Sequence, residues 1–83
     1  MLKEATITLR GKTTTIKYIV VGVDKIDHAI VTWENGERTT FYKGLYGVKN
    51  RWETKDMPAD LIDLLSEIFE KETPVQMDVD IYG

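Results

Sequence analysis

Apolar residues at every second position predict β-strands over most of the first half of the chain. Between residues 4 and 10, alanine, isoleucine and leucine alternate with threonine, as in a strand with one buried face. A longer β-rich segment, residues 13–23, follows a turn at residues 10–12. From Tyr18 to Val21 it is apolar at consecutive positions, which indicates a strand that is central in a sheet or covered on both faces.

The pair Asn35–Gly36 predicts a β-hairpin, because a two-residue type I′ turn needs positive φ at both central positions and these residue types tolerate it. Such a turn places Trp33 opposite Arg38 and puts Trp33 and Tyr42 on the same face of the hairpin. Each face then carries apolar side chains, and only one can lie under a helix. The face around Trp33 and Tyr42 is therefore expected to need a cover or a partner.

Residues 58–72 carry the pattern of an amphipathic helix. Six apolar residues recur at helical spacing and form one broad stripe: Leu61, Ile62, Leu64, Leu65, Ile68 and Phe69. Acidic residues lie on the opposite side. Pro58 is expected at the first helical position, and Pro74 ends the helix near residues 71–72, because the residue before a proline is disfavoured in the α region.

After the helix, four apolar residues alternate with polar ones and predict a final strand: Val75, Met77, Val79 and Ile81. The expected fold class is α+β, an antiparallel β-meander with one amphipathic helix packed on it and a C-terminal return strand, in the order ββββαβ. The alternative is a small SH3-like β-barrel with an added helix, which accounts for strands that are apolar on both faces. The length suits one core, so residues 1–83 are expected to form a single domain.

The charge of the chain is unevenly distributed. The net charge is −3, but residues 1–55 carry ten Lys/Arg against six Asp/Glu, whereas residues 56–83 carry one Lys against eight Asp/Glu. The first part is therefore positive and the second strongly negative. A small protein with two such poles can attract partners of either sign, so the net charge does not select a class of partner.

The residues needed for several kinds of chemistry are missing or poorly arranged. The chain has no cysteine, which excludes thiolate zinc sites, disulfides and cysteine nucleophiles. Its one histidine, His28, and its one serine, Ser66, do not form a recognisable nucleophile motif. We therefore expect no enzyme activity, no cofactor and no metal site. No signal-peptide pattern or membrane-length apolar run is present, so a cytoplasmic location without membrane contact is expected.

The first functional hypothesis is a non-enzymatic binding module that acts on a protein partner of unknown identity. One candidate surface is the acidic helix face, formed by Asp60, Asp63, Glu67 and Glu70, whose regular carboxylates could imitate a phosphate backbone and inhibit a nucleic-acid-handling protein. The other is the sheet face around Trp33 and Tyr42. Two copies of the chain could cover this face in each other, so the protein is expected to be a monomer or a homodimer. For the acidic face the ordinary interpretation is a solvated helix surface.

The second hypothesis is a nucleic-acid-binding domain that uses the basic and aromatic segment 43–52. Its candidate residues are Lys43, Tyr46, Lys49, Arg51 and Trp52. Cations can neutralise phosphates while aromatic rings stack on bases, so this composition suits single-stranded nucleic acid. The ordinary interpretation is that Trp52 fills the core and the cations remain solvated. The longer connection, residues 43–56, is also expected to be functional or to contain a short extra strand, because of its length.

Overall fold

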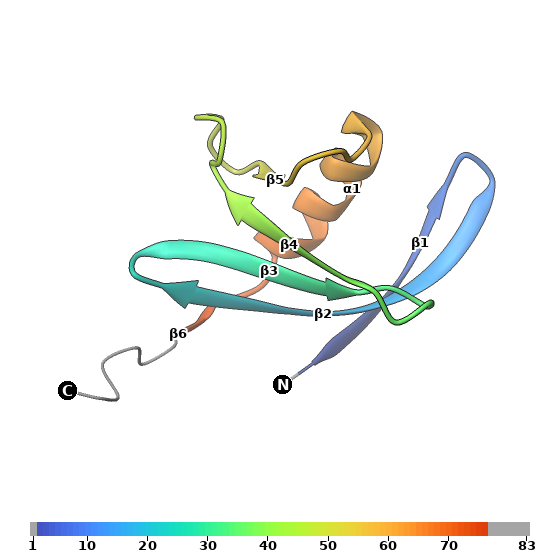
Figure 1. Ribbon diagram of the computed structural model, residues 1–83, viewed down its shortest axis with the longest axis horizontal. Coiled ribbons are helices and arrows are strands. Elements are labelled where there is room, and N and C mark those ends of the chain that lie inside the picture. The colour runs from blue at the N-terminus through green and yellow to red at the C-terminus, as the bar shows by residue number, and fades with distance from the viewer. Residues whose placement is uncertain (1, 77–83) are drawn as a thin grey trace.

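The computed structural model describes residues 2–76 and shows one curled sheet with one helix (Figure 1). The elements are β1 (Lys3–Leu9), β2 (Lys12–Val23), β3 (Ile26–Thr32), β4 (Arg38–Lys43), β5 (Trp52–Glu53), α1 (Ala59–Glu70) and β6 (Val75–Gln76). The predicted α+β class, a meander with a helix packed on it, is confirmed. The segment between β4 and α1 contains the short extra strand β5.

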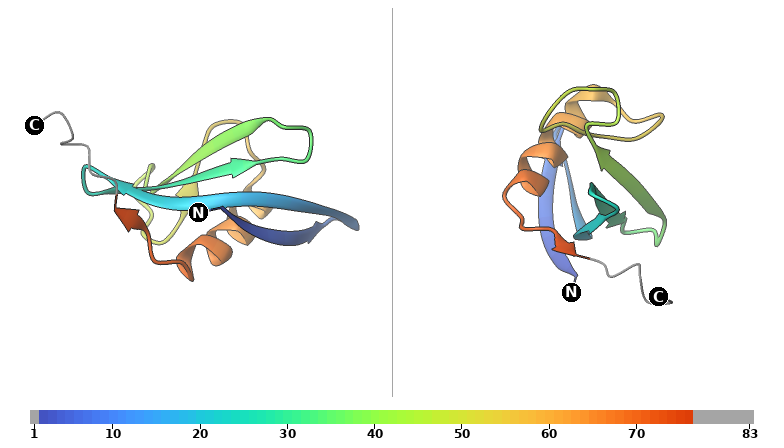
Figure 2. Two further views of the ribbon diagram at one scale, coloured as in Figure 1. Left: turned by 90° about the horizontal axis from the view of Figure 1, so that it is seen from below. Right: turned by 90° about the vertical axis from the view of Figure 1, so that its left-hand side faces the viewer.

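The sheet follows the chain in the order β1-β2-β3-β4-β5, with every neighbouring pair antiparallel. The return strand β6 pairs with β2 in parallel, at Val21 and Gly22. Because β1 pairs with β2 only as far as Tyr18, β6 continues the same edge beyond it. Figure 2 shows the sheet curled into a half-barrel with α1 beside β1, a shape that also agrees with the barrel alternative. Met77, Val79 and Ile81 of the predicted final strand lie outside the described residues.

Two hairpin turns have the positive φ angles of a type I′ turn. Arg10 and Gly11 have φ of 54° and 78° between β1 and β2, and Asp24 and Lys25 have φ of 52° and 69° between β2 and β3. Positive φ at both central positions is the mark of a type I′ turn, whose twist matches that of the flanking strands. These two turns give continuous registers along β2, which is the longest strand and pairs with β1, β3 and β6.

The predicted register of the β3–β4 hairpin is wrong by one residue. Thr32, and not Trp33, lies opposite Arg38. The Trp33 N–H donates to the Glu37 carbonyl at 2.8 Å, and the Gly36 N–H donates to the Trp33 carbonyl at 2.9 Å. Gly36, with φ of 90°, is the only loop residue at positive φ. The turn is therefore a three-residue loop that ends in a left-handed glycine.

Burial explains why the hairpin takes the extra loop residue. Ala29 lies directly opposite Phe41, and both are fully buried, as is Val31. In the two-residue turn, Phe41 would face away from these core residues, because a one-residue shift turns every side chain of a strand to the other face. The shift also separates the predicted pair: Trp33 packs against the core, and Tyr42 projects from the opposite face. The predicted common face of Trp33 and Tyr42 does not exist.

The helix begins one residue later and ends slightly earlier than predicted. Pro58 has an extended ψ of 143° and is the N-cap, and its carbonyl accepts from the Ile62 N–H at 3.0 Å. The apolar stripe packs on the sheet as expected, with its innermost side chains fully buried. Phe69 is at the centre of this core, because its ring lies 5.7, 5.7 and 5.5 Å from three other rings, those of Tyr18, Phe41 and Trp52. Trp52 is 1% exposed, so its interpretation as a core residue is confirmed.

Candidate functional site

Contacts between α1 and β1 involve both ends of the helix. Arg10, just after β1, donates two hydrogen bonds of 2.9 Å to the carboxylate of Asp60 in the first turn of α1. At the other end, Lys3 forms an ion pair with Glu72, which also accepts from the Tyr18 hydroxyl at 3.1 Å. The hydrogen bond from Lys3 lowers the pKa of Glu72, and the Tyr18 bond adds to this against the effect of burial. The helix is therefore antiparallel to β1 along its whole length.

Glu70 connects the last turn of α1 to the end of β4 and to the core. Its carboxylate accepts from Lys43 Nζ at 2.9 Å and from Trp52 Nε1 at 2.8 Å. Burial alone would raise the pKa of Glu70, but the hydrogen bonds from Lys43 and Trp52, with the lysine charge, outweigh it and lower the pKa. Lys43 Nζ also lies 5.6 Å from the centre of the Trp52 ring, within cation–π range.

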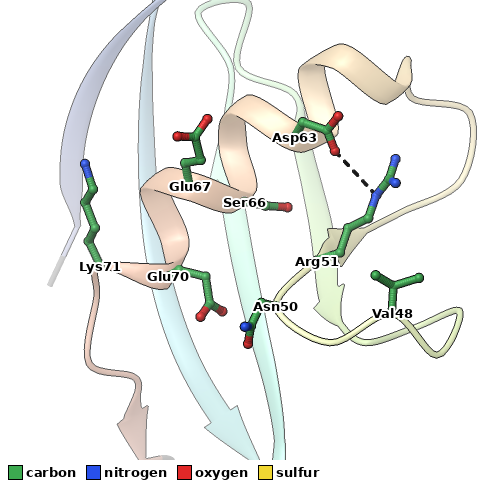
Figure 3. Close-up of a pocket in the computed structure, with 8 residues that line it drawn as sticks. All are labelled: Val48, Asn50, Arg51, Asp63, Ser66, Glu67, Glu70 and Lys71. Carbon is green, nitrogen blue, oxygen red and sulfur yellow. Dashed lines mark ion pairs between the residues drawn. The ribbon is translucent and has the colours of Figure 1, made fainter.

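A hollow of about 630 Å³ lies between α1 and the segment that precedes β5 (Figure 3). Arg51 Nε is 3.7 Å from Asp63 on the helix and 3.6 Å from the buried carboxylate of Glu53. Below them the Trp52 backbone N–H donates to Ser66 Oγ at 2.9 Å. Both contacts of Arg51 Nε are longer than a hydrogen bond, and this nitrogen and Glu53 Oε2 are buried without a hydrogen-bond partner among the described residues. Ser66, at the floor of the hollow, accepts its hydrogen bond from the interior.

The acidic helix face is neutralised from within the molecule. Three of its four carboxylates, Asp60, Asp63 and Glu70, lie within ion-pair distance of a cation from the first 55 residues. Glu67 is exposed and has no such partner among residues 2–76. The two oppositely charged parts of the sequence therefore face each other in the fold. What the helix presents to solvent is largely paired charge, and not a row of free carboxylates.

The segment 43–52 is divided by the fold. Lys43, Arg51 and Trp52 turn toward the helix, as described above. Tyr46 is 60% exposed, and Lys49 is also exposed, in a loop whose ends meet through a 2.9 Å hydrogen bond from the Gly44 N–H to the Arg51 carbonyl. The predicted set of cations and aromatic rings is thus not displayed on one surface: Trp52 has no free ring face, and its neighbours are in ion pairs.

A third surface, which the sequence did not single out, is the face of β2, β3 and β4 that points away from α1. We define the outer sheet face as Ile19, Val21, Ile26, His28, Ile30 and Tyr42. The strand registers place Ile19 opposite Ile30, and they align Val21, His28 and Tyr42 in one row across three strands. The rings of His28 and Tyr42 meet edge to face at 4.7 Å.

None of the residues of the outer sheet face belongs to the cluster that packs around α1. Tyr42 is 36% and Ile26 is 49% exposed, and the others are partly or fully shielded by their neighbours in the sheet. The consecutive apolar residues at positions 18–21 were the signal for this surface, because every second one had to point away from the core. The expected register of the β3–β4 hairpin placed Tyr42 on the face of Trp33, and so separated it from Ile30.

Neither a metal centre nor a membrane span is found in the part of the chain that the structure describes. Residues 2–76 contain no group of three His, Asp or Glu side chains placed to hold an ion. The 12-residue helix α1 is the only one there, and it lacks the length to cross a bilayer.

Comparison with known proteins does not place the chain in a group. No family model matches it, and neither the curated proteins nor the solved structures include a similar one.

Proposed function

We propose that this chain is a non-enzymatic module that binds a protein partner through the outer sheet face. The observation that carries the proposal is the row of Val21, His28 and Tyr42, which crosses three strands on the side of the sheet without a helix. Val21 is buried, but half-exposed Ile26 and Tyr42, with partly exposed Ile19, His28 and Ile30, form a largely apolar patch on this side. Such patches on small proteins mark interaction sites more often than scattered apolar residues do.

The energetics favour this face over the acidic helix face. Complete burial of one large apolar side chain contributes about 1.5–3 kcal/mol, and an aromatic ring such as Tyr42 is a common anchor at the centre of an interface. On the helix, a partner would first have to displace the cations that already bind Asp60 and Glu70. Exchanging one ion pair for another gives little net affinity. The outer sheet face requires no such exchange.

The test compares two double variants in an affinity capture from the native host. The first, Ile26→Asp with Tyr42→Ala, disrupts the outer sheet face. The matched control, Leu45→Asp with Tyr46→Ala, makes equivalent changes in the exposed 44–51 loop, where both residues are at least 44% exposed. Circular dichroism first establishes that both variants are folded.

We expect one stoichiometric partner that is retained by the wild-type chain and by the loop variant and lost by the outer-face variant. Direct titration of the purified partner should then show at least a tenfold weaker affinity for the outer-face variant, since about 1.4 kcal/mol corresponds to a factor of ten. If the outer-face variant retains the partner as well as the wild type does, the proposal is wrong. Loss in the loop variant alone would place the binding surface at Leu45 and Tyr46 instead.

A further inference from the structure

The end of the half-barrel at the β1–β2 hairpin contains a second hollow, which we call the end hollow. Its volume is about 440 Å³, within the range of about 300–1,000 Å³ that ligand pockets occupy. The apolar side chains of Leu9, Trp33, Pro58 and Leu61 form most of its wall. Trp33 connects it to β4, because its indole N–H donates to Thr39 Oγ1 at 2.8 Å.

The first half of β4, which Trp33 contacts through Thr39, has an open edge. On one side β4 pairs with β3 from Arg38 to Tyr42, but on the other side it pairs with β5 only at Tyr42 and Lys43. Tyr42 directs its backbone groups toward β5, so by the alternation of an antiparallel ladder Arg38 and Thr40 direct theirs to the same side. Among residues 2–76 no strand pairs with them there. Such an edge is a template for an added strand.

The pleat of the sheet determines the side chains that an added strand should carry. On the face toward the core, the neighbours are Thr39 and buried Phe41, so apolar residues fit that side. On the opposite face, Arg38 is exposed and would be the direct neighbour of the added strand. A cation at this position favours acidic residues on that side. The complementary strand therefore alternates apolar and acidic residues.

We infer that the open edge of β4 binds residues 77–83 of a second copy of this chain. These residues, Met-Asp-Val-Asp-Ile-Tyr-Gly, alternate in the required way. Such a strand would place Val79 and Ile81 on the core side, beside Thr39 and Phe41, and Asp78 and Asp80 on the side of Arg38. The inference does not depend on the outer sheet face or on its protein partner.

The donor must be a second copy because the segment of the same copy is too short. β6 lies on the β1 side of β2, so the following residues would have to cross β2, β3 and β4 to reach the open edge. That crossing is about 19 Å, at four strand spacings of about 4.8 Å. Seven residues extend to at most about 25 Å. Fewer than two residues would remain to lie along β4.

The first measurement is the mass of the full chain in solution by light scattering over a range of concentrations. We expect a mass above the 9.6 kDa of one chain, because one copy inserting into the next produces a ring, a filament or a reciprocal dimer. The variant Val79→Asp with Ile81→Asp should remain a monomer. A wild-type chain that stays monomeric at millimolar concentration overturns the inference.

The second measurement uses a fluorescent synthetic peptide of residues 75–83 and the monomeric Val79→Asp, Ile81→Asp chain, whose own segment no longer competes. We expect saturable binding, about tenfold weaker when Asp78 and Asp80 of the peptide are replaced by Asn, and weaker at high salt. Because these changes are made in the peptide, folding of the protein is not affected. Absence of binding, or equal binding of the two peptides, contradicts the inference.

Variants of the acceptor locate the site. Arg38→Glu should weaken peptide binding severalfold, whereas the matched reversal Lys49→Glu, also at an exposed position, should not. The outer-face variant used to test the proposed function should assemble like the wild type. If it alone prevents assembly, the copies associate through the outer sheet face and this inference is wrong, whether or not a protein partner exists.

Discussion

The backbone N–H of Trp52 donates a 2.9 Å hydrogen bond to Ser66 Oγ in the interior of the protein. Strand β5 has only two residues, and its free edge faces the middle of α1. A serine there, 7% exposed, satisfies a backbone donor that would otherwise be buried without a partner. The only serine of the chain thus has a structural role, in the place of the strand that would close a complete barrel.

Replacing this serine by alanine should destabilise the fold. Ser66→Ala leaves the Trp52 N–H buried and unpaired, at a cost of about 1–3 kcal/mol. Urea unfolding followed by tryptophan fluorescence measures the difference. Glu67→Ala, at the next and exposed position, is the matched control and should change the free energy of unfolding by less than about 0.5 kcal/mol. Equal stability of Ser66→Ala and wild type would show that this bond contributes nothing.

Truncation of Phe69 should have the largest effect of any single core change. Phe69→Ala removes a fully buried ring that contacts three others, and such changes cost about 3–5 kcal/mol. The total stability of a domain is only about 5–15 kcal/mol, so we expect a Tm lower by tens of degrees or a chain unfolded at 37 °C. Phe69→Leu, which retains most of the volume, should remain folded with a smaller loss. A Tm within a few degrees of wild type for Phe69→Ala would contradict this packing.

Periodicity was sufficient to predict the first four strands and the helix, because burial of one face imposes a spacing of 2 or 3.6 residues that is visible in the local sequence. The register of the β3–β4 hairpin was not predictable in this way. Asn35–Gly36 suits a two-residue turn, but a left-handed Gly36 alone also completes a three-residue loop. Which of the two loops forms depends on the burial of Phe41 against Ala29. This contact between two strands is not visible in the local sequence pattern.

The neutralised helix face was unpredictable for a different reason. Asp60 is 50 positions from its partner Arg10, and Glu70 is similarly remote from Lys43. Within the helix segment almost no balancing charge lies at i,i+4 spacing, although the fold supplies it from the first 55 residues. The charge asymmetry between the two parts of the sequence was visible, but it suggested external partners of either sign. In the structure the two parts are partners of each other.

The corrected register can be tested directly by NMR. In the observed hairpin Thr32 and Arg38 are opposite each other as a non-hydrogen-bonded pair, and the α protons of such pairs approach closely. We expect a strong cross-strand Hα–Hα contact between these two residues. The same contact between Trp33 and Arg38 would instead establish the two-residue turn. Gly36→Ala should cost about 1 kcal/mol, because alanine is strained at a φ of 90°.

The ion pairs of Glu70 should make stability depend on pH in a defined direction. The pKa of Glu70 is lower in the folded protein than its ordinary value of 4.5, so the folded state favours the charged form. The stabilisation is therefore complete above about pH 5 and is lost as the pH falls through the lowered pKa. Glu70→Gln removes this contribution, so the difference in unfolding free energy between wild type and variant should be largest near pH 7 and shrink toward pH 3. Urea unfolding at pH 7, 5 and 3 measures it, with Glu67→Gln as the exposed control. A difference that stays constant over this range would show that the charge of Glu70 does not act through Lys43 and Trp52.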